Sequence, residues 1–294
     1  MNKSTQTISW LDKLKILLEM IKFQHTIFAL PFAFAGALLA ARGFPGPEQS
    51  LWILLAMIGA RTVAMGLNRI ADREFDAENP RTKDRALVTG DIGTKEAWLM
   101  VLIAGTVYFI AAYNLTPLSF ELSPLFLFAI CFYSYTKRFT HMCHLFLGFA
   151  IGLAPVAGWI AIANSIDTVA VLLGLGVMFW IAGFDVLYAC MDSEFDRKRG
   201  LHSIPAWLGR ENAFRVSAAF HIIAFVAFTA TGLAASLNWI YFLGIAATFV
   251  LLILQRRVIT PNDLSKMNIA FFRLNAIISV VLFFATALSL WSIS

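Results

Sequence analysis

The sequence predicts an all-α integral membrane protein with about nine transmembrane helices. Of its 294 residues, 59% are hydrophobic and only 14% are charged, whereas soluble domains contain about 25% charged residues. The mean hydropathy of the chain is +0.74. An apolar run of about 20 residues is long enough to cross a bilayer as a helix. Such runs are found at 25–41, 51–69, 95–113, 118–136, 143–162, 167–189, 211–234, 237–255 and 272–291.

The chain is expected to form a single transmembrane domain over residues 1–294, with an amphipathic segment at 1–24. That segment carries Asp12, Glu19 and four lysines, which a cleavable signal peptide would not contain in its apolar core. Apolar side chains repeat on one side of 8–23, which favours a helix lying on the membrane surface. The first apolar run, 25–41, is short and is interrupted by a proline and a glycine.

The basic residues predict how the helices are oriented. With nine spans, one side of the membrane receives the N-terminal segment and the loops near 70–94, 137–142, 190–210 and 256–271. All of the 23 Lys and Arg residues except Arg42 and Arg61 lie on or beside that side. The positive-inside rule makes it cytoplasmic, as in a multi-pass protein of a bacterial inner membrane. The net charge of +5 follows from this bias, so we expect the lipid bilayer and no nucleic acid as a partner.

Two nearly identical acidic segments occupy matching positions in the two halves of the chain. They read D-R-E-F-D at 72–76 and D-S-E-F-D at 192–196, and each follows a long apolar run. In a helix, residues i and i+4 lie on one face, about 6 Å apart. Two carboxylates so close repel each other unless a cation lies between them. Mg²⁺ is such a cation: it keeps several of its waters and takes its remaining ligands from carboxylates and substrate phosphates. We therefore predict Mg²⁺ as the cofactor and Asp72, Asp76, Asp192 and Asp196 as its ligands and catalytic residues.

Basic loops that contain a proline follow both acidic pairs. The first pair is followed by 79–85, with Arg81 and Arg85, and the second by 197–205. Asn68 lies one helical turn before the first pair and adds an amide to the same stripe. Metal-binding carboxylates with cations beside them are suited to bind a diphosphate.

Two more polar residues lie near the second pair. Asp185 is predicted to lie one or two turns deeper in its helix, where an acidic residue is costly and usually faces a polar cavity or a partner. We expect it to face the same cavity as the acidic pairs or to pair with Arg61 or Asn275. His202 follows the second pair and is predicted to contact the substrate.

Taken together, these segments resemble the UbiA superfamily of intramembrane aromatic prenyltransferases. The run N-R-I-A-D-R-E-F-D at 68–76 is similar to that family's N-x-x-x-D-x-x-x-D motif, and 192–196 is similar to its second aspartate motif. Between them, Y-S-Y-T-K-R at 133–138 resembles the family's Y-P-x-x-K-R segment, with Ser134 in place of the proline. The three motifs and the nine expected spans cover essentially the whole chain.

The resemblance implies a fold of nine helices around a central cavity that is open to lipid, with the active-site loops on the cytoplasmic side. It also implies Mg²⁺-dependent transfer of a polyprenyl group from a polyprenyl diphosphate to an aromatic hydroxy acid. By the same resemblance one Mg²⁺ is bound by Asn68, Asp72 and Asp76, and a second by Asp192 and Asp196. The implied substrate and diphosphate site contains Tyr133, Lys137, Arg138, and Arg81 or Arg85.

The acceptor has two candidates. The wider resemblance is to the 4-hydroxybenzoate polyprenyltransferases of ubiquinone and related quinone biosynthesis. Three local segments, at 28–33, 185–192 and 200–205, resemble instead the prenyltransferase of the futalosine route to menaquinone, whose acceptor is 1,4-dihydroxy-6-naphthoate. We favour this second branch. Either acceptor has a carboxylate, for which the intramembrane residues Arg61 and His25 are candidate partners.

Two other functions fit part of the pattern. Intramembrane acidic residues and a weak internal repeat also occur in cation- or proton-coupled transporters. The acidic pairs here lie at helix ends on one side, however, and the adjoining cations would repel a cation substrate. A phosphotransferase acting on a nucleotide-linked lipid precursor also binds metal through intramembrane aspartates, but its aspartates are concentrated in one motif.

Overall fold

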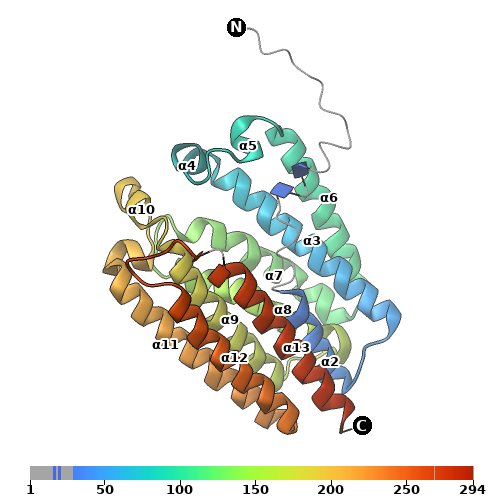
Figure 1. Cartoon of the computed structure of the whole chain (residues 1–294). Helices are drawn as coiled ribbons and strands as arrows, with labels where there is room; N and C mark the ends of the chain where they lie inside the picture. The colour runs from blue at the N-terminus through green and yellow to red at the C-terminus, as the bar shows by residue number, and fades with distance from the viewer. Residues whose placement is uncertain (1–15, 18, 21–28, 268, 294) are drawn as a thin grey trace.

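The protein is a bundle of membrane-length helices (Figure 1). The computed structural model describes residues 16–17, 19–20, 29–267 and 269–293. The helices are α2 (Leu30–Ala41), α3 (Pro47–Ala71), α4 (Arg73–Glu78), α5 (Ala86–Thr89), α6 (Thr94–Tyr113), α7 (Pro117–Thr136), α8 (Cys143–Ala163), α9 (Thr168–Ala189), α10 (Ser193–Arg199), α11 (Ile204–Ala234), α12 (Trp239–Val258), the π-helix η2 (Ile269–Leu274) and α13 (Asn275–Trp291).

The predicted fold class is confirmed in the described part of the chain. Eight described helices are long and apolar enough to cross a membrane, and α2 is a shorter apolar helix, so together they match the nine predicted runs. The predicted span at 211–234 agrees with the long part of α11, which follows a kink at Gly209, but α11 itself begins earlier, at Ile204. Ser203 caps a first helical turn there, which Gly209, with a φ of 80°, separates from the long span.

The short helices α4, α5 and α10 lie together at one end of the bundle, opposite the end of α13 (Figure 1). They belong to the basic loops that the charge pattern assigned to one side. Most of the predicted segment 1–24, and His25, lie outside the described residues. Of that segment, Ile16, Leu17 and Met20 pack with Leu87 and Ile92 of the first basic loop. These apolar side chains therefore contact the protein itself.

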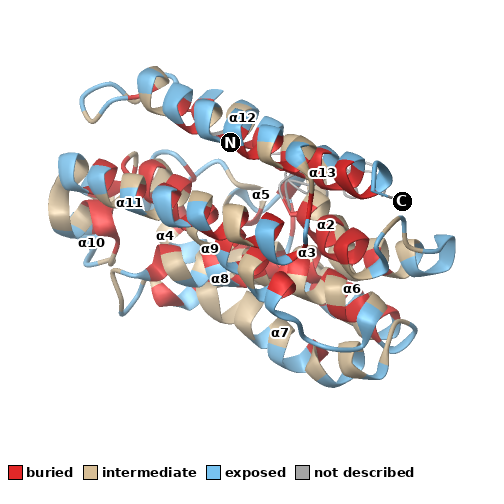
Figure 2. Ribbon diagram, turned by 90° about the horizontal axis from the view of Figure 1, so that it is seen from below, coloured by how far each residue is buried: buried red, intermediate tan, exposed pale blue. Residues whose placement is uncertain are grey.

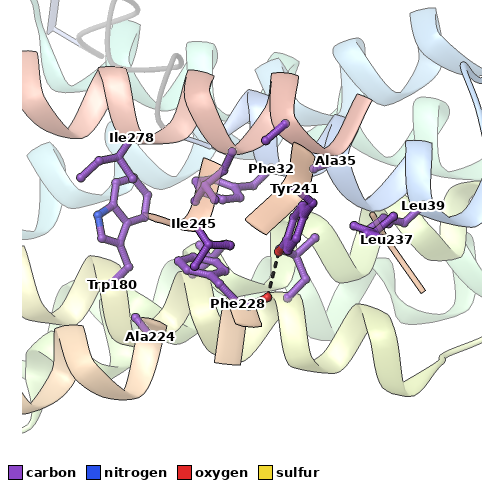
Figure 3. Packing of buried hydrophobic residues seen from close by; sticks show 14 of the residues in the cluster. Phe32, Ala35, Leu39, Trp180, Ala224, Phe228, Leu237, Tyr241, Ile245 and Ile278 are labelled. Atoms are coloured by element: carbon purple, nitrogen blue, oxygen red, sulfur yellow. Dashed lines mark hydrogen bonds between the residues drawn. The ribbon is translucent and has the colours of Figure 1, made fainter. Parts of the chain in front are cut away.

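The core lies around α9, which packs against α8 on one side and α11 on the other. Buried residues face the centre of the bundle and exposed residues cover its outside (Figure 2). Many of the exposed residues are large and apolar, as expected where lipid is the surrounding solvent. At the centre, the rings of Phe32, Trp180 and Phe228 pack together. The hydroxyl of Tyr241 donates a hydrogen bond of 2.9 Å to the carbonyl of Phe228 (Figure 3), so its polar group is satisfied within the apolar core.

Small residues allow α2, α8 and α9 to approach closely. A Cβ atom on Gly36 would lie 2.0 Å from the carbonyl oxygen of Pro155, and one on Gly148 would lie 2.2 Å from that of Met178. Membrane helices commonly associate through such small residues, because lipid gives no hydrophobic drive for helix association. The glycine that interrupts the first apolar run, Gly36, is thus a contact point between helices.

Candidate active site

An apolar cavity of about 170 Å³ lies between α2, α3, α6, α7 and α8. Its walls are formed mainly by alanines and branched aliphatic side chains, which leave room along α3 and α8. At one end the walls include Arg61 and Tyr133. On α7 the lining extends from Ser119 to Tyr133, a length of about 21 Å at 1.5 Å per residue.

A polar cavity of about 130 Å³ continues from this end. On α3 the lining passes from Met65 in the apolar cavity to Asn68 in the polar one, and on α7 it passes from Tyr133 to Ser134. The two cavities therefore follow one another along the same two helices. Eight of the predicted site residues line the polar cavity: Asn68, Asp72, Asp76, Arg81, Arg85, Lys137, Arg138 and Asp192.

The acidic pairs are built in the same way in the two halves. Asp72 lies between α3 and α4 with φ −94° and ψ 5°, and Asp192 immediately precedes α10, three residues after the end of α9, with φ −101° and ψ 2°. These dihedral angles lie in the sparsely populated bridge region, where many active-site residues are found. In both segments the N–H of the second aspartate donates a 2.8 Å hydrogen bond to the carbonyl of the first. The sequence repeat is thus also a structural repeat.

Each of the four aspartates is paired with a cation. Arg81 binds Asp192 through two hydrogen bonds, from Nε at 2.9 Å and from Nη2 at 2.5 Å. Arg85 contacts Asp76 at 2.5 Å, and Lys137 contacts Asp196 at 2.7 Å. The fourth pair is looser, because Arg138 lies 3.7 Å from Asp72. Asp72 is therefore the carboxylate whose charge the protein itself neutralises least.

The pKa directions agree with these contacts. Burial raises the pKa of Asp72 above its usual value, and the nearby charge of Asp76 raises it further. Burial would also raise the pKa of Asp192, but the hydrogen bonds and charge of Arg81 outweigh it, so the pKa is lowered. Burial would lower the pKa of Lys137, but the charge of Asp196 raises it overall. Asp192 and Lys137 are consequently charged at neutral pH.

Two predicted site residues lie at the edges of the polar cavity. Asp196 is fully buried beneath it, where Ser203 Oγ donates a 3.0 Å hydrogen bond to its second oxygen. Tyr133 lines the neighbouring apolar cavity, next to Arg61. Asp196 would need Lys137 to move, or to share its carboxylate, before it could bind a metal.

Asp185 and His202 are not among the residues that line either described cavity. The carboxylate of Asp185 lies 2.7 Å from Nδ1 of His144, and its predicted pairing with Arg61 or Asn275 stays a prediction. The ring of His202 lies 4.7 Å from that of His141, and its backbone N–H donates to the carbonyl of Lys137. The predicted contact of these two residues with substrate stays a prediction.

Sequence reasoning did not single out two residues of this site as site residues. Asn79 is buried, donates a 3.1 Å hydrogen bond to Asp192 and accepts one of 2.9 Å from the backbone N–H of Arg81. Tyr188 accepts a hydrogen bond of 3.3 Å from Arg81 and stacks beneath its guanidinium. The position of Tyr188 in the sequence could have identified it as a site residue, because it precedes Asp192 by four residues, just as Asn68 precedes Asp72.

The donor set is suited to Mg²⁺ bound together with a phosphate ligand. Among the described residues, no three His, Cys, Asp or Glu side chains converge to form a metal site. Each half instead offers two carboxylates, and the first half adds Asn68, whose amide donates a 2.9 Å hydrogen bond to Asp72. Mg²⁺ commonly takes one or two carboxylates and completes its shell with waters and substrate phosphates. The residues present therefore fit such an ion.

Fold and cavities together define a polytopic helical membrane protein with an acidic and basic cavity at the end of an apolar one. The chain belongs to the UbiA prenyltransferase family, whose sequence profile matches residues 29–277. The predicted family, and with it the predicted prenyltransferase class, is thereby confirmed.

Individual proteins with similar sequences support the assignment to this family. The chain is 32% identical to a 4-hydroxybenzoate octaprenyltransferase of Methylobacillus flagellatus over 78% of this chain and 77% of that protein. It is also 32% identical to a protein of the same name from Aromatoleum aromaticum, over 84% of this chain and 83% of the relative.

Solved structures of the family share the fold. A UbiA homologue from Aeropyrum pernix K1 superposes with a TM-score of 0.82 and 34% identity, covering 90% of this chain and 98% of that one. A UbiA homologue from Archaeoglobus fulgidus bound to GPP and Mg²⁺ superposes with a TM-score of 0.68 and 20% identity, over 92% and 99% of the two chains. The second likeness concerns the fold alone.

Proposed function

We propose that this protein transfers a polyprenyl group from a polyprenyl diphosphate to a small aromatic hydroxy acid in quinone biosynthesis, with Mg²⁺ as cofactor. The observation that carries the proposal is the arrangement of the two cavities. An acidic and basic cavity suits a metal-bound diphosphate, and the apolar cavity that follows it suits an isoprenoid chain. A polyprenyl diphosphate has both parts in that order.

The donor diphosphate is assigned to the polar cavity. Arg81, Arg85, Lys137 and Arg138 line it, and each can exchange an aspartate for a phosphate oxygen. Asn68, Asp72 and Asp76, and in the other half Asp192 and Asp196, would hold Mg²⁺. The ion, when bound, stabilises the negative charge of the leaving diphosphate. The relatives bound to GPP or DMAPP and Mg²⁺ support this assignment for the family fold.

The reaction begins when the allylic C–O bond breaks and its electron pair leaves with the diphosphate. The positive charge stays on the allylic carbon. A carbon of the electron-rich acceptor ring attacks it, forming the new C–C bond, and loss of the ring proton restores aromaticity. Arg and Lys side chains around the diphosphate favour this charge separation. The apolar walls exclude water, which would otherwise trap the cation as an alcohol.

The acceptor is assigned to the junction of the two cavities, where Arg61 lies in an otherwise largely apolar wall. Arg61 and Asn68 are seven residues apart on α3 and so lie on nearly the same face, about 10 Å apart along the axis. A guanidinium in such a place can bind the acceptor's carboxylate bidentately. Tyr133 of α7 lies in the same lining and supplies an aromatic face and a hydroxyl.

For the acceptor we propose two compounds to be tested side by side. The curated relatives named above are 4-hydroxybenzoate octaprenyltransferases, which supports 4-hydroxybenzoate. The segments at 28–33, 185–192 and 200–205 resemble the naphthoate branch and support 1,4-dihydroxy-6-naphthoate. Two of these segments contain residues beside the site, namely Tyr188 and Ser203.

The test is prenyl transfer by the purified full-length protein in lipid, with Mg²⁺, polyprenyl diphosphates of several lengths and each acceptor separately. We expect product with one acceptor and none with an Asp72→Ala, Asp192→Ala variant. The matched control is Glu74→Ala, Glu194→Ala, which removes two exposed acids from the same short helices and should keep activity. No product with either acceptor from well-folded protein would reject the proposal, and cation transport would then be measured in vesicles.

A further inference from the structure

A buried hydrogen-bonded chain connects α9 to the start of α11 without entering either cavity. Asp185 Oδ2 lies 2.7 Å from Nδ1 of His144, and the backbone N–H of Ile204 donates to Nε2 of the same ring at 3.3 Å. The side chain of His144 is only 2% exposed. The imidazole of His144 thus joins the start of α8, the start of α11 and the last third of α9.

The two contacts of His144 define its tautomer. Because Nε2 accepts the Ile204 N–H, it carries no proton, so the ring's proton is on Nδ1 and is donated to Asp185. A carboxylate on one ring nitrogen commonly fixes the other nitrogen as an acceptor in this way. Asp185 therefore determines whether His144 can accept from Ile204.

The start of α11 is held by the His202 N–H, which donates to the carbonyl of Lys137 at 2.7 Å, and by the buried N–H of Ile204, which needs a partner outside its own helix. The first N–H groups of a helix have no partner within it. Pro205 has no N–H, and the N–H of Ala206 donates to Ser203 Oγ at 3.3 Å. That leaves Ile204, whose partner comes from another helix. His144 thus satisfies a buried donor and fixes the position of the preceding residue, Ser203.

Ser203 in turn holds a carboxylate of the second acidic pair. Its hydroxyl accepts from Ala206 and donates to Oδ2 of Asp196 at 3.0 Å, and both Ser203 and Asp196 are completely buried. We propose that Asp185 and His144 are positioning residues, which fix the start of α11 and, through Ser203, the orientation of the Asp196 carboxylate. The catalytic consequence of this arrangement rests on the proposed function.

Substitutions at Asp185 separate this role from direct contact with substrate or metal. Asp185→Asn keeps an oxygen that accepts the His144 Nδ1 proton, and the side chain is 23% exposed, so its amide group can reach solvent. Asp185→Leu removes the acceptor. A positioning role therefore predicts that the asparagine variant resembles the wild type and the leucine variant does not. If the charge of Asp185 acted directly on substrate or metal, both variants would lose activity, because both remove that charge.

The first measurement is amide hydrogen exchange over 200–207, in full-length protein without substrate. We expect faster exchange at Ile204 in Asp185→Leu and in His144→Phe, and wild-type exchange in Asp185→Asn. The second is the Mg²⁺ concentration that gives half-maximal rate. It should rise about 10-fold or more in the two disruptive variants, as for other residues that orient metal ligands. Their combination should be no worse than His144→Phe alone, because the two residues act as one unit.

The proposal is overturned if Asp185→Asn is as inactive as Asp185→Leu, or if exchange at Ile204 is the same in all variants. Should the leucine variant fail to fold, His144→Phe takes its place as the disruptive variant. Faster exchange at Ile204 in His144→Phe, with wild-type exchange and Mg²⁺ dependence in Asp185→Asn, supports positioning, and loss of activity in Asp185→Asn contradicts it. The exchange arm needs no turnover. It therefore distinguishes failure of this inference from failure of the proposed reaction, which the wild-type assay reports.

Discussion

The four aspartates differ in how strongly the protein itself binds them. Asp192 receives two hydrogen bonds from Arg81 and a third from Asn79, whereas the cation nearest to Asp72 lies 3.7 Å away. Charge-assisted, bidentate pairs are about twice as strong as neutral hydrogen bonds. Asp72 therefore has the most to gain from an added cation, and the second half of the site must first release Arg81.

The Arg81–Asp192 pair should make stability depend on pH. The folded-state pKa of Asp192 lies below its ordinary value, so the pair stabilises fully above the unfolded pKa of about 3.9 and less as pH falls through the folded value. We expect Arg81→Gln to lower the Tm at pH 7 and the difference from wild type to shrink below about pH 4. Thermal unfolding in detergent from pH 7 to pH 3 measures this.

The control for that experiment is Lys198→Gln, which removes an exposed cation from the neighbouring helix α10. It should leave the Tm nearly unchanged at every pH. A Tm difference for Arg81→Gln that stays constant down to pH 3 would show that Arg81 stabilises the fold by packing and not by its charge on Asp192.

At the residue scale, the spacing of residues in the sequence predicted the acidic pairs but not the side chains that bind to them. The i, i+4 acidic pairs could be identified because helical geometry is local. The partner of Asp192 could not be identified from the sequence, because Arg81 belongs to the other half of the chain. Which of several nearby arginines pairs with Asp192 depends on how two loops meet. Asn79 was missed for the same reason: an asparagine before a proline usually indicates a turn, and its long-range hydrogen bond has no local signal.

At the scale of helices, small residues set the distances between α2, α8 and α9. Gly148→Ala should destabilise the protein by roughly 1–3 kcal/mol, because the new methyl group overlaps a backbone carbonyl of α9 that cannot move alone. Gly105→Ala is the control in α6, since its methyl group would meet only Val63 at 3.8 Å. That variant should be neutral or more stable by up to about 1 kcal/mol.

Unfolding of both variants in mixed micelles would measure these differences. Equal loss of stability in the two would mean that glycine acts here through the flexibility of its own helix, and not through contact between helices.

The long helices were predictable and the short ones were not. A bilayer requires about 20 apolar residues for each span, so the apolar runs of the sequence located the eight described span-length helices and the shorter α2. The helices α4 and α10 each contain six or seven residues with many charges, and no hydrophobic stripe marks them. Each begins directly after an aspartate in the bridge region, and in the first half that aspartate, Asp72, also ends the preceding helix. The early start of α11 likewise depends on Ser203, Pro205 and the distant His144.

At the scale of the whole molecule, the apolar cavity should determine which donors fit. Ala56 lines it about 24 Å along α3 from Asp72. We expect Ala56→Phe to lower kcat/KM for long polyprenyl donors by about 10-fold or more, a loss of at least roughly 1.4 kcal/mol. A donor of two isoprene units does not reach that depth and should be affected less than about 2-fold.

Steady-state kinetics with donors of increasing length would measure this dependence. The control is Leu102→Phe, which enlarges a side chain that is 64% exposed on the outer face of α6 and should change neither value. Equal loss for short and long donors with Ala56→Phe would contradict the assignment of the cavity to the isoprenoid chain.

The distribution of charge over the whole bundle also predicts its orientation. The short helices and the basic loops share one end of the bundle (Figure 1) and supply most of the residues that line the polar cavity. The opposite end carries Arg42 as its basic residue among those described. Lys and Arg are retained on the cytoplasmic side during insertion, so α4 should be cytoplasmic and the loop between α8 and α9 should not. Ala77→Cys and Ser165→Cys place a thiol at an exposed position on each end.

A membrane-impermeant maleimide applied to intact cells should label Ser165→Cys at once and Ala77→Cys only after the membrane is permeabilised. The native cysteines Cys143 and Cys190 are buried and Cys131 is half-buried, so wild-type protein provides the background. This orientation would place the diphosphate site on the side where water-soluble acceptors are made. Labelling of Ala77→Cys in intact cells would reverse the topology, and the excess of basic residues would then have to be explained by the diphosphate site alone.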